Sequence, residues 1–311
     1  PTERLNSVAL EYAATPSGRV CDNWNIERLS STRELLKSRR VPHTTNAILY
    51  GGLDYDLGKN ELIAESHQGT CHNTHASRSG ALGINRYGVE FLPGTIAEVN
   101  EIAKRFEKKT IQYRTITGKE GTEESFKSIM GQYVDILHLA THGFFWSPEV
   151  AEKRNYVSFL QRKEINSNEE DAMLRSGLLF TGANVALMGE ELPEDVEDGV
   201  LTAKELSNMN LWNVDLVVMS ACESGLGETS GEGVFGLQRG FKLAGANTLL
   251  MSLWKVDDEA TKILMTEFYR YYLSGKTKQE SLHLAQLTLR NNPEFADPKY
   301  WAAFILLDAL N

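Results

Sequence analysis

Two residue types that together hydrolyse peptide bonds occur at the ends of two apolar segments. His142 and Gly143 follow VDILHLAT, and Cys222 follows VDLVVMSA. A thiol and an imidazole are the two parts of a cysteine nucleophile and its acid/base partner. The backbone N–H groups of Gly143 and Cys222 could polarise a scissile carbonyl as an oxyanion hole. The spacing alone leaves open that Cys222 is a small buried hydrophobic residue and His142 a capping or core histidine.

The rest of the chain must hold these two segments side by side. Both are apolar throughout, as strands buried on both faces are, and helical patterns separate them from further strands of the same kind. This alternation predicts an α/β fold, a doubly wound, mostly parallel sheet with helices on both faces. Ligands of such sheets bind beyond the carboxyl ends of the strands. We therefore expect His142 and Cys222 at the same edge of the sheet.

Local patterns give the expected elements. Apolar runs predict strands over residues 46–52, 111–118, 134–140, 174–182, 214–220, 246–254 and 301–309. Apolar residues spaced by three and four predict helices over residues 25–40, 93–106, 123–130, 201–209, 233–244, 259–273 and 278–290. Thr202 and Glu205 are placed to form a capping box. Residues 54–92 show no sustained periodicity and are expected to be mostly loop, and residues 147–199 a long, largely irregular insert.

Composition excludes several classes of protein. Of the 311 residues, 32 are Lys or Arg and 42 are Asp or Glu, so the formal net charge is 32 − 42 = −10. That balance argues against a nucleic-acid-binding surface, which needs clustered basic residues. No apolar run approaches the ~20 residues that span a bilayer, so no membrane partner is expected. Three cysteines exclude a disulfide scaffold and favour a reducing, cytoplasmic location.

Two other motifs carry a weaker signal. His67, Cys71, His72 and His75 place four potential metal ligands within nine residues, but their spacing matches no established zinc pattern. We expect a polar loop there, with an adventitious metal-binding loop as the alternative. Residues 231–236 read GEGVFG, a literal G-x-G-x-x-G, but its glutamate would repel a pyrophosphate. No metal and no cofactor is therefore expected.

The segments HLATHGFF, LVVMSACESGLG, GVFGLQRGFKLAGANTLLMSLWKVDDEAT and KYWAAFILL together resemble the CHAT family. These are caspase-like cysteine peptidase domains, often associated with tetratricopeptide repeats and grouped in one clan with caspases, separases and gingipains. ILYGGLDYD, LPGT, LRSGLLFTGAN and DGVLTAKEL extend the resemblance over roughly residues 45–311. It implies that His142 is the catalytic histidine and Cys222 the nucleophile of a cysteine endopeptidase. The alternative is a caspase-like interaction or scaffold module without turnover.

The resemblance also suggests where the substrate side chain binds. In the related separases, a Trp-x-Val-x-Asp stretch lines the pocket for a basic P1 residue, and WKVDD puts Asp258, with Asp257 beside it, in that place. A carboxylate there would favour Arg or Lys. Both residues are equally well placed to cap the following helix. Asp54 and Asp56, after the strand ILYGGL, are second candidates for the same pocket.

The expected organisation follows from the same likeness. Residues 1–44 are expected to be a helical or linker segment, the end of a larger regulatory region, and residues 45–311 the peptidase domain. The expected partners are a protein substrate and a regulatory tetratricopeptide-repeat or sensor region, in cis or in trans, in bacterial-type signalling or defence. The first residue, Pro1, points to a removed initiator Met or to a piece of a longer chain. With a basic P1 residue, the self-cleavage candidates of the insert are Arg154, Arg162, Lys163 and Arg175.

Overall fold

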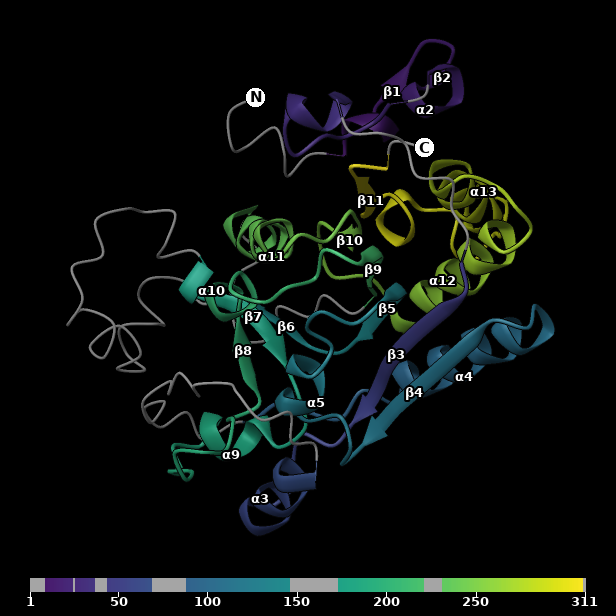
Figure 1. Cartoon of the computed structure of the whole chain (residues 1–311). Coiled ribbons are helices and arrows are strands. Elements are labelled where there is room, and N and C mark those ends of the chain that lie inside the picture. The colour runs from purple at the N-terminus through teal and green to yellow at the C-terminus, as the bar shows by residue number, and fades with distance from the viewer. Residues whose placement is uncertain are drawn as a thin grey trace.

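A six-stranded sheet forms the centre of the molecule, with strand order β11-β10-β9-β5-β3-β4 (Figure 1). Its strands are β3 (Asn46–Leu53), β4 (Gln112–Gly118), β5 (Val134–Ala140), β9 (Val214–Met219), β10 (Thr248–Ser252) and β11 (Phe304–Leu307). All neighbours pair in parallel except β10 and β11. The computed structural model describes residues 9–24, 26–36, 44–68, 88–145, 173–220 and 231–309, with Gln68 and residues 231–235 described by their backbone alone.

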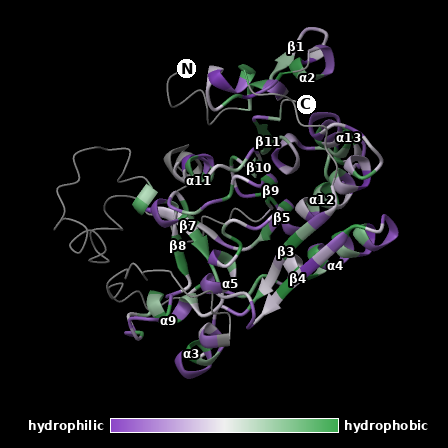
Figure 2. Ribbon diagram, viewed as in Figure 1, coloured by the Kyte–Doolittle hydropathy of each residue, from purple (hydrophilic) through white to green (hydrophobic). Residues whose placement is uncertain are grey.

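Helices cover both faces of the sheet, as the strand and helix patterns predict. One core joins one face of the sheet to α4 (Pro93–Lys108), α12 (Asp258–Tyr272) and α13 (Lys278–Arg290). The other core contains residues of α5 (Glu123–Lys127), α10 (Ala203–Leu206) and α11 (Gly231–Ala244). Successive side chains of β3 alternate between the two cores, with Leu49 in the first and Tyr50 in the second. In Figure 2 the outer helices carry both hydrophilic and hydrophobic stretches, as two-sided helices do.

A second, three-stranded antiparallel sheet continues from the end of β5. It consists of β6 (Gly143–Phe145), β7 (Ser176–Leu179) and β8 (Val200–Thr202), in that order. The strand expected over residues 174–182 therefore exists, but it is wrong to place it in the parallel sheet. Its backbone lies tightly against β8, since a Cβ atom on Gly177 would come within 2.1 Å of the Leu201 carbonyl oxygen. The expected capping box of Thr202 and Glu205 is confirmed at the start of α10.

Two of the less regular segments differ in part from what the sequence predicts. Within residues 26–36, the described part of the predicted helix 25–40, only Thr32–Leu36 is helical, as the 3-10 helix η2. The preceding residues run along the sheet edge instead, because Arg28 forms a bridge with Leu307 and Ser30 hydrogen-bonds to Asp308. The expected loop after β3 contains the helix α3 (Lys59–Gln68). Few apolar residues mark this helix in the sequence, because it packs against a small cluster and not against a main core. Leu62 joins Val185 and Val196 in that cluster.

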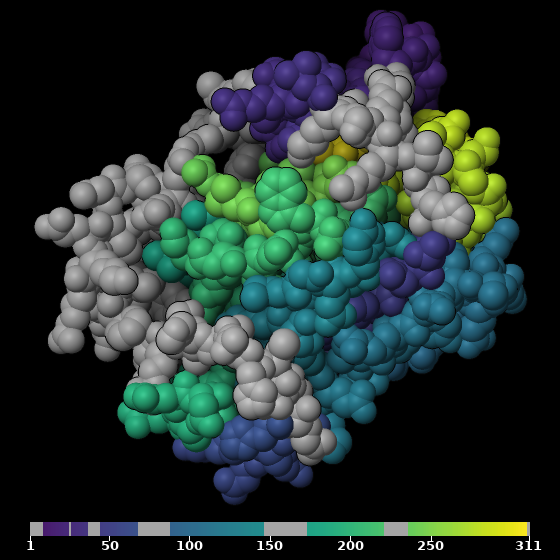
Figure 3. All heavy atoms as spheres, in the orientation of Figure 1, coloured from purple at the N-terminus to yellow at the C-terminus, as the bar shows by residue number. Residues whose placement is uncertain are grey.

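The N-terminal elements lie against the C-terminal part of the chain. They are η1 (Leu10–Tyr12), β1 (Ala14–Thr15), β2 (Gly18–Arg19), α2 (Val20–Asn23) and η2. The hydroxyl of Tyr12 donates to Gln286, and Asp22 forms an ion pair with Arg290 of α13. Figure 3 shows the purple N-terminal atoms beside the yellow-green C-terminal ones. Residues 9–36 thus close the β11 edge of the sheet. In the insert, the helix α9 (Ala183–Leu187) follows β7, and the sequence patterns do not predict it.

Candidate active site

The carboxyl ends of β3, β5, β9 and β10 meet at one edge of the central sheet. His142 follows β5 by two residues, and Ser220 directly follows β9. The two strand ends are neighbours, because Leu139 is paired with Met219 and the Ser220 N–H donates to the Leu139 carbonyl over 3.2 Å. Cys222 lies outside the described residues, two positions beyond Ser220. The described chain therefore brings the residues that precede Cys222 to the strand that carries His142.

The imidazole of His142 is buried and oriented from two sides. Its Nε2 atom lies 2.7 Å from the backbone carbonyl oxygen of Glu90. A carbonyl oxygen only accepts, so Nε2 carries the hydrogen and proton exchange falls to Nδ1. The ring of Tyr55 lies 4.9 Å away, centroid to centroid. The Tyr55 hydroxyl also accepts a hydrogen bond from the backbone N–H of His142 over 3.3 Å. A second hydrogen bond, 2.8 Å long, joins it to the Thr141 hydroxyl.

Asn184, in α9, holds the segment that contacts His142. Its side-chain oxygen accepts from the Val89 N–H over 2.8 Å, and its side-chain nitrogen donates to the Val89 carbonyl over 3.0 Å. The same nitrogen donates to Asp56 over 2.6 Å. Asn184 is buried, so these bonds are shielded from water. Two hydrogen bonds to the backbone of one residue fix both the position and the direction of the peptide units next to Glu90.

Gly143 begins β6, directly after the histidine. The Leu179 N–H donates to the His142 carbonyl over 2.9 Å, and Gly143 is opposite Leu178 in the ladder. In an antiparallel pair the hydrogen-bonding direction alternates from one residue to the next, which directs the Gly143 N–H away from β7. Among the described residues, a Cβ atom at Gly143 would make only ordinary contacts, 3.7 Å from Gly177 and 3.8 Å from Leu237. The described part of the fold therefore has room for a side chain at this position.

A pocket opens at the same edge, between α4, the ends of β9 and β10, and the start of α12. Leu92, two residues after Glu90, and Ser220, two residues before Cys222, belong to its wall. The full lining is Leu92, Gly94, Thr95, Glu98, Ser220, Ser252, Lys255, Val256, Asp258 and Thr261. The pocket is thus next to the chain segments of both expected dyad residues, and three of its lining side chains are of charged types.

The neighbouring residues Asp257 and Asp258 occupy different positions. Asp257 is the N-cap of α12, and its carboxylate accepts from the N–H groups of Glu259 and Ala260 over 3.0 and 3.1 Å. Asp258 is the first residue of the helix and lines the pocket, close to Gly94. The helix-capping alternative therefore describes Asp257, whereas Asp258 lines the pocket.

Asp54 and Asp56 follow β3 on the other side of His142. The backbone of Asp54 accepts from Gly182 over 3.0 Å, and the side chain of Asp56 accepts from Asn184. Neither residue is among those that line the pocket beside Ser220. Their described contacts hold the loop that carries Tyr55, so they connect to the histidine rather than to that pocket.

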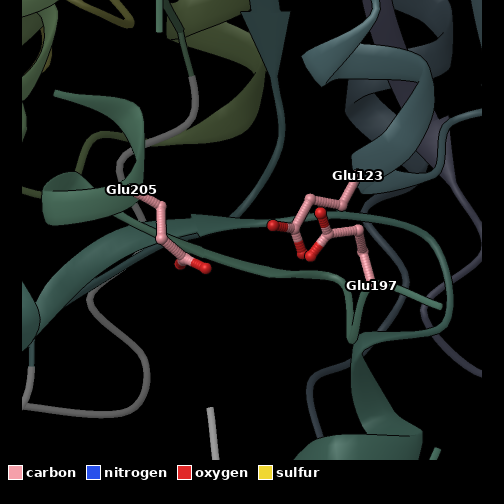
Figure 4. Close-up of side chains that lie close together, drawn as sticks. All are labelled: Glu123, Glu197 and Glu205. Carbon is pink, nitrogen blue, oxygen red and sulfur yellow. The ribbon is translucent and has the colours of Figure 1, made fainter. Parts of the chain in front are cut away.

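A second group of carboxylates comprises two buried glutamates and one half-buried glutamate. Glu123, Glu197 and Glu205 have carboxylate oxygens within 4.8 Å of one another (Figure 4). The Lys127 ammonium lies 2.7 Å from Glu123, 2.7 Å from Glu197 and 3.9 Å from Glu205. A lysine thus takes the place that a metal ion would take among three carboxylates. Burial, opposed by Lys127, raises the pKa of Glu123 and of Glu197 above the usual range.

The other sequence motifs fall largely elsewhere. His67 lies 3.3 Å from Asp195 in an exposed pair, and Cys71, His72 and His75 are outside the described residues. The GEGVFG segment begins α11. Arg175 is buried, with its guanidinium 5.1 Å from the Phe145 ring, whereas the other basic candidates for self-cleavage, Arg154, Arg162 and Lys163, lie outside the described residues.

Sequence reasoning did not identify three residues of the site, Tyr55, Asn184 and Glu98. Tyr55 is buried and lies in the sequence between Asp54 and Asp56. Asn184 lies in a short helix that the sequence does not predict. Glu98 belongs to the amphipathic pattern of α4, but it is only 3% exposed. A glutamate on the apolar face of a helix is the one signal that could have indicated it.

Comparison with known proteins gives two results. A family model described as "CHAT domain" matches residues 1–309. The chain is similar to tetratricopeptide repeat protein 28 of Mus musculus, with 34% identity over 108 residues, and of Homo sapiens, with 31% identity over 112 residues. These alignments cover 35% and 36% of this chain and only 4% of each relative. Among the described helices, none is long and apolar enough to cross a membrane.

Proposed function

The chain belongs to the CHAT-domain family, and from this premise we propose that it is a cysteine endopeptidase with Cys222 as nucleophile and His142 as its acid/base partner. The family's relation to caspase-like peptidases agrees with the mostly parallel sheet and its flanking helices. The observation that carries the proposal is the position of His142. It lies at the carboxyl edge, beside the strand that leads to Cys222, with Nε2 bound to the Glu90 carbonyl.

In the first step, the Cys222 thiolate attacks the carbonyl carbon of the scissile peptide bond. The C–S bond forms and the carbonyl oxygen becomes an oxyanion, which accepts from the N–H groups of Gly143 and Cys222. Protonated Nδ1 of His142 gives its proton to the amide nitrogen, the C–N bond breaks and the amine product leaves. The Glu90 carbonyl supports this role, because it stabilises the imidazolium through the Nε2–H bond.

In the second step, water hydrolyses the thioester. Neutral Nδ1 of His142 takes a proton from the water molecule, and the resulting hydroxide attacks the acyl carbon. The C–S bond breaks, the acid product leaves, and the thiolate is restored beside the imidazolium. The Glu90 carbonyl and the packed ring of Tyr55 hold the imidazole in one orientation through both steps, while the Tyr55 hydroxyl holds the backbone N–H of His142. This order lowers the entropic cost of reaching the transition state.

The proposed substrate is a protein with a basic P1 residue. Asp258 supports this choice, because it lines the pocket next to Ser220 and a carboxylate binds a guanidinium or ammonium by charge-assisted hydrogen bonds. Asp257 is excluded as the main determinant, since its carboxylate is engaged with the α12 backbone. Asp54 and Asp56 are assigned to the support of the Tyr55 loop.

The proposed setting is a reducing cytoplasm, with activity gated by a tetratricopeptide-repeat or sensor region in cis or in trans. The relatives that support this are named tetratricopeptide repeat proteins, and this chain aligns with 4% of their length. A gate of this kind would restrict cleavage to few partner proteins.

Profiling with a peptide library tests the activity. We expect cleavage after Arg and Lys by the wild-type protein, and no cleavage by Cys222→Ala or His142→Ala. Melting temperatures of the variants control for folding. Equal turnover by Cys222→Ala would disprove the assigned nucleophile, and cleavage after apolar residues alone would disprove the basic P1 preference.

A further inference from the structure

A buried carboxylate forms part of the pocket at the carboxyl edge, and it has no role in the proposed binding of the P1 side chain by Asp258. Glu98 lines the pocket although it is only 3% exposed, so its carboxylate lies deep rather than at the rim. We propose that Glu98 is a specificity-determining residue that binds the cationic end of an Arg or Lys P1 side chain at the base of this pocket. This inference rests on the proposed function, whose assigned P1 carboxylate is Asp258.

The position of the pocket relates it to the scissile bond. Its wall includes Leu92, two residues after the Glu90 carbonyl that holds His142, and Ser220, two residues before Cys222. A P1 side chain is attached to the carbon next to the attacked carbonyl, so it must enter the cavity nearest the nucleophile and its partner. This pocket contacts both the segment that holds His142 and the segment that leads to Cys222.

The carboxylate of Glu98 lies next to a buried histidine, which in turn contacts a buried tyrosine. Its Oε1 atom lies 3.0 Å from Nε2 of His138, which is fully buried in β5. Nδ1 of His138 lies 3.1 Å from the hydroxyl of Tyr269 in α12. Burial, and next the charge of Glu98, raise the pKa of Tyr269, so its hydroxyl keeps its proton beside Nδ1.

This arrangement places the carboxylate without satisfying it. Oε1 of Glu98 and Nε2 of His138 are both buried, and among the described residues neither atom has a hydrogen-bond partner. A buried carboxylate without a full counter-charge is costly, and an incoming guanidinium or ammonium removes that cost. The pocket thereby favours a cation over an apolar side chain of similar length.

The charged residues that line the pocket agree with a cationic ligand. Two are acidic, Glu98 at 3% exposure and Asp258 at the start of α12, and one is basic, Lys255. Lys255 belongs to the exposed class, whereas Glu98 is buried. A side chain that reaches the base of the pocket therefore meets the carboxylate of Glu98, and one at the mouth meets Asp258 and Lys255.

The test compares Glu98→Gln with Glu101→Gln, an exposed glutamate one turn further along α4. The measured quantity is the ratio of kcat/KM for peptides with P1 Arg to kcat/KM for matched peptides with P1 norleucine. We expect this ratio to fall at least ~10-fold in Glu98→Gln, as the loss of a hydrogen bond between charged groups implies, and to stay unchanged in Glu101→Gln. An unchanged ratio in Glu98→Gln would overturn the inference.

Two further measurements keep the result interpretable. Tyr269→Phe removes only the hydroxyl that contacts His138, and we expect a smaller fall of the same ratio. This variant replaces Glu98→Gln if the latter does not fold.

Binding of benzamidine to Cys222→Ala, measured by calorimetry, reports on the pocket without turnover. Benzamidine binding that is lost in Cys222→Ala/Glu98→Gln supports the inference even if no peptide is cleaved, in which case only the proposed function fails. Binding that is absent, or equal with and without Glu98, overturns the inference.

Discussion

The Nε2 atom of His142 lies 2.7 Å from the carbonyl oxygen of Glu90, a residue 52 positions earlier in the chain. This contact assigns the hydrogen of the imidazole to Nε2, so Nδ1 is the atom that exchanges protons in the proposed mechanism. The contact depends on how the segment before Glu90 is held. Asn184 holds it through two bonds to the backbone of Val89.

Replacing Asn184 by Ala is expected to loosen the orientation of His142 without removing any contact with the substrate. The segment around Glu90 loses its two side-chain bonds, the imidazole is less well oriented, and kcat should fall by roughly 10- to 100-fold with little change in KM. Steady-state kinetics on a P1 Arg peptide measures both constants. Asn208→Ala, at an exposed position, is the matched control and should leave both unchanged. A change confined to KM would show that Asn184 does not act through the histidine.

Gly143→Ala is expected to separate catalysis from folding. The added Cβ makes only ordinary contacts with the described residues, so the melting temperature should stay close to that of the wild type. The same methyl group would lie beside the proposed oxyanion hole, and kcat/KM should fall by about 100-fold, as when one oxyanion donor is lost.

Gly177→Ala supplies the contrast. A Cβ there lies 2.1 Å from the Leu201 carbonyl oxygen and 2.7 Å from the Phe144 ring. We expect a loss of stability, measured by thermal unfolding, that Gly143→Ala does not show. A strongly destabilised Gly143→Ala protein would contradict the claim that this glycine is needed for substrate rather than for the fold.

Asp257 and Asp258 are expected to respond in opposite ways to substitution by Ala. Loss of the N-cap bonds in Asp257→Ala should lower the free energy of unfolding by ~1 kcal/mol and leave P1 selectivity unchanged. Asp258→Ala should reduce cleavage after Arg with a small effect on stability. Denaturant unfolding and peptide profiling, performed on both variants, measure the two effects. Cleavage after Arg that persists unchanged in Asp258→Ala would remove this residue from the pocket.

The buried carboxylates around Lys127 predict a pH dependence of stability. Burial raises the pKa of Glu123 well above its usual range, and that of Asp198 to about 8. The folded state therefore binds more protons than the unfolded state between the two pKa values of each group. Stability from these groups is present below their unfolded pKa values, ~4, and is lost as the pH rises toward 8.

Glu123→Gln should flatten this decline, because the amide cannot ionise. Urea unfolding at pH 5, 6.5 and 8 measures the slope. Glu120→Gln, at an exposed position nearby, should keep the wild-type slope. A wild-type stability that rises steadily from pH 5 to pH 8 would contradict the raised pKa values.

The central sheet could be predicted from the sequence because each of its strands is strongly apolar. VDILHLA and VDLVVMS become β5 and β9, and the capping residue Thr202 marks the start of α10. Of the small antiparallel sheet, only β7 could be predicted, and not its partners. β6 and β8 have three residues each, which is too short for a periodic pattern. The helix expected over residues 25–40 fails for another reason. Contacts of Arg28 and Ser30 with the β11 edge, which no local pattern reveals, outweigh its helical spacing.

The site shows the same division. Strand ends and residue types indicated His142 and the neighbourhood of Asp258, because the topology of a parallel sheet determines where they meet. Glu90, Asn184 and Glu98 act through a backbone carbonyl, an amide pair and a buried carboxylate. Their roles depend on contacts between distant parts of the chain, so they become visible only in three dimensions.

Covalent labelling of Cys222 tests the central claim most directly. The protein is treated with a peptidyl acyloxymethyl ketone that carries Arg at P1, and the modified residue is identified by mass spectrometry of the digested protein. The account predicts modification of Cys222 in the wild-type protein, strong reduction in His142→Ala, and none in Cys222→Ala, with Cys21 unmodified throughout. Labelling of Cys21 at an equal rate, or equal labelling of Cys222 without His142, would contradict it.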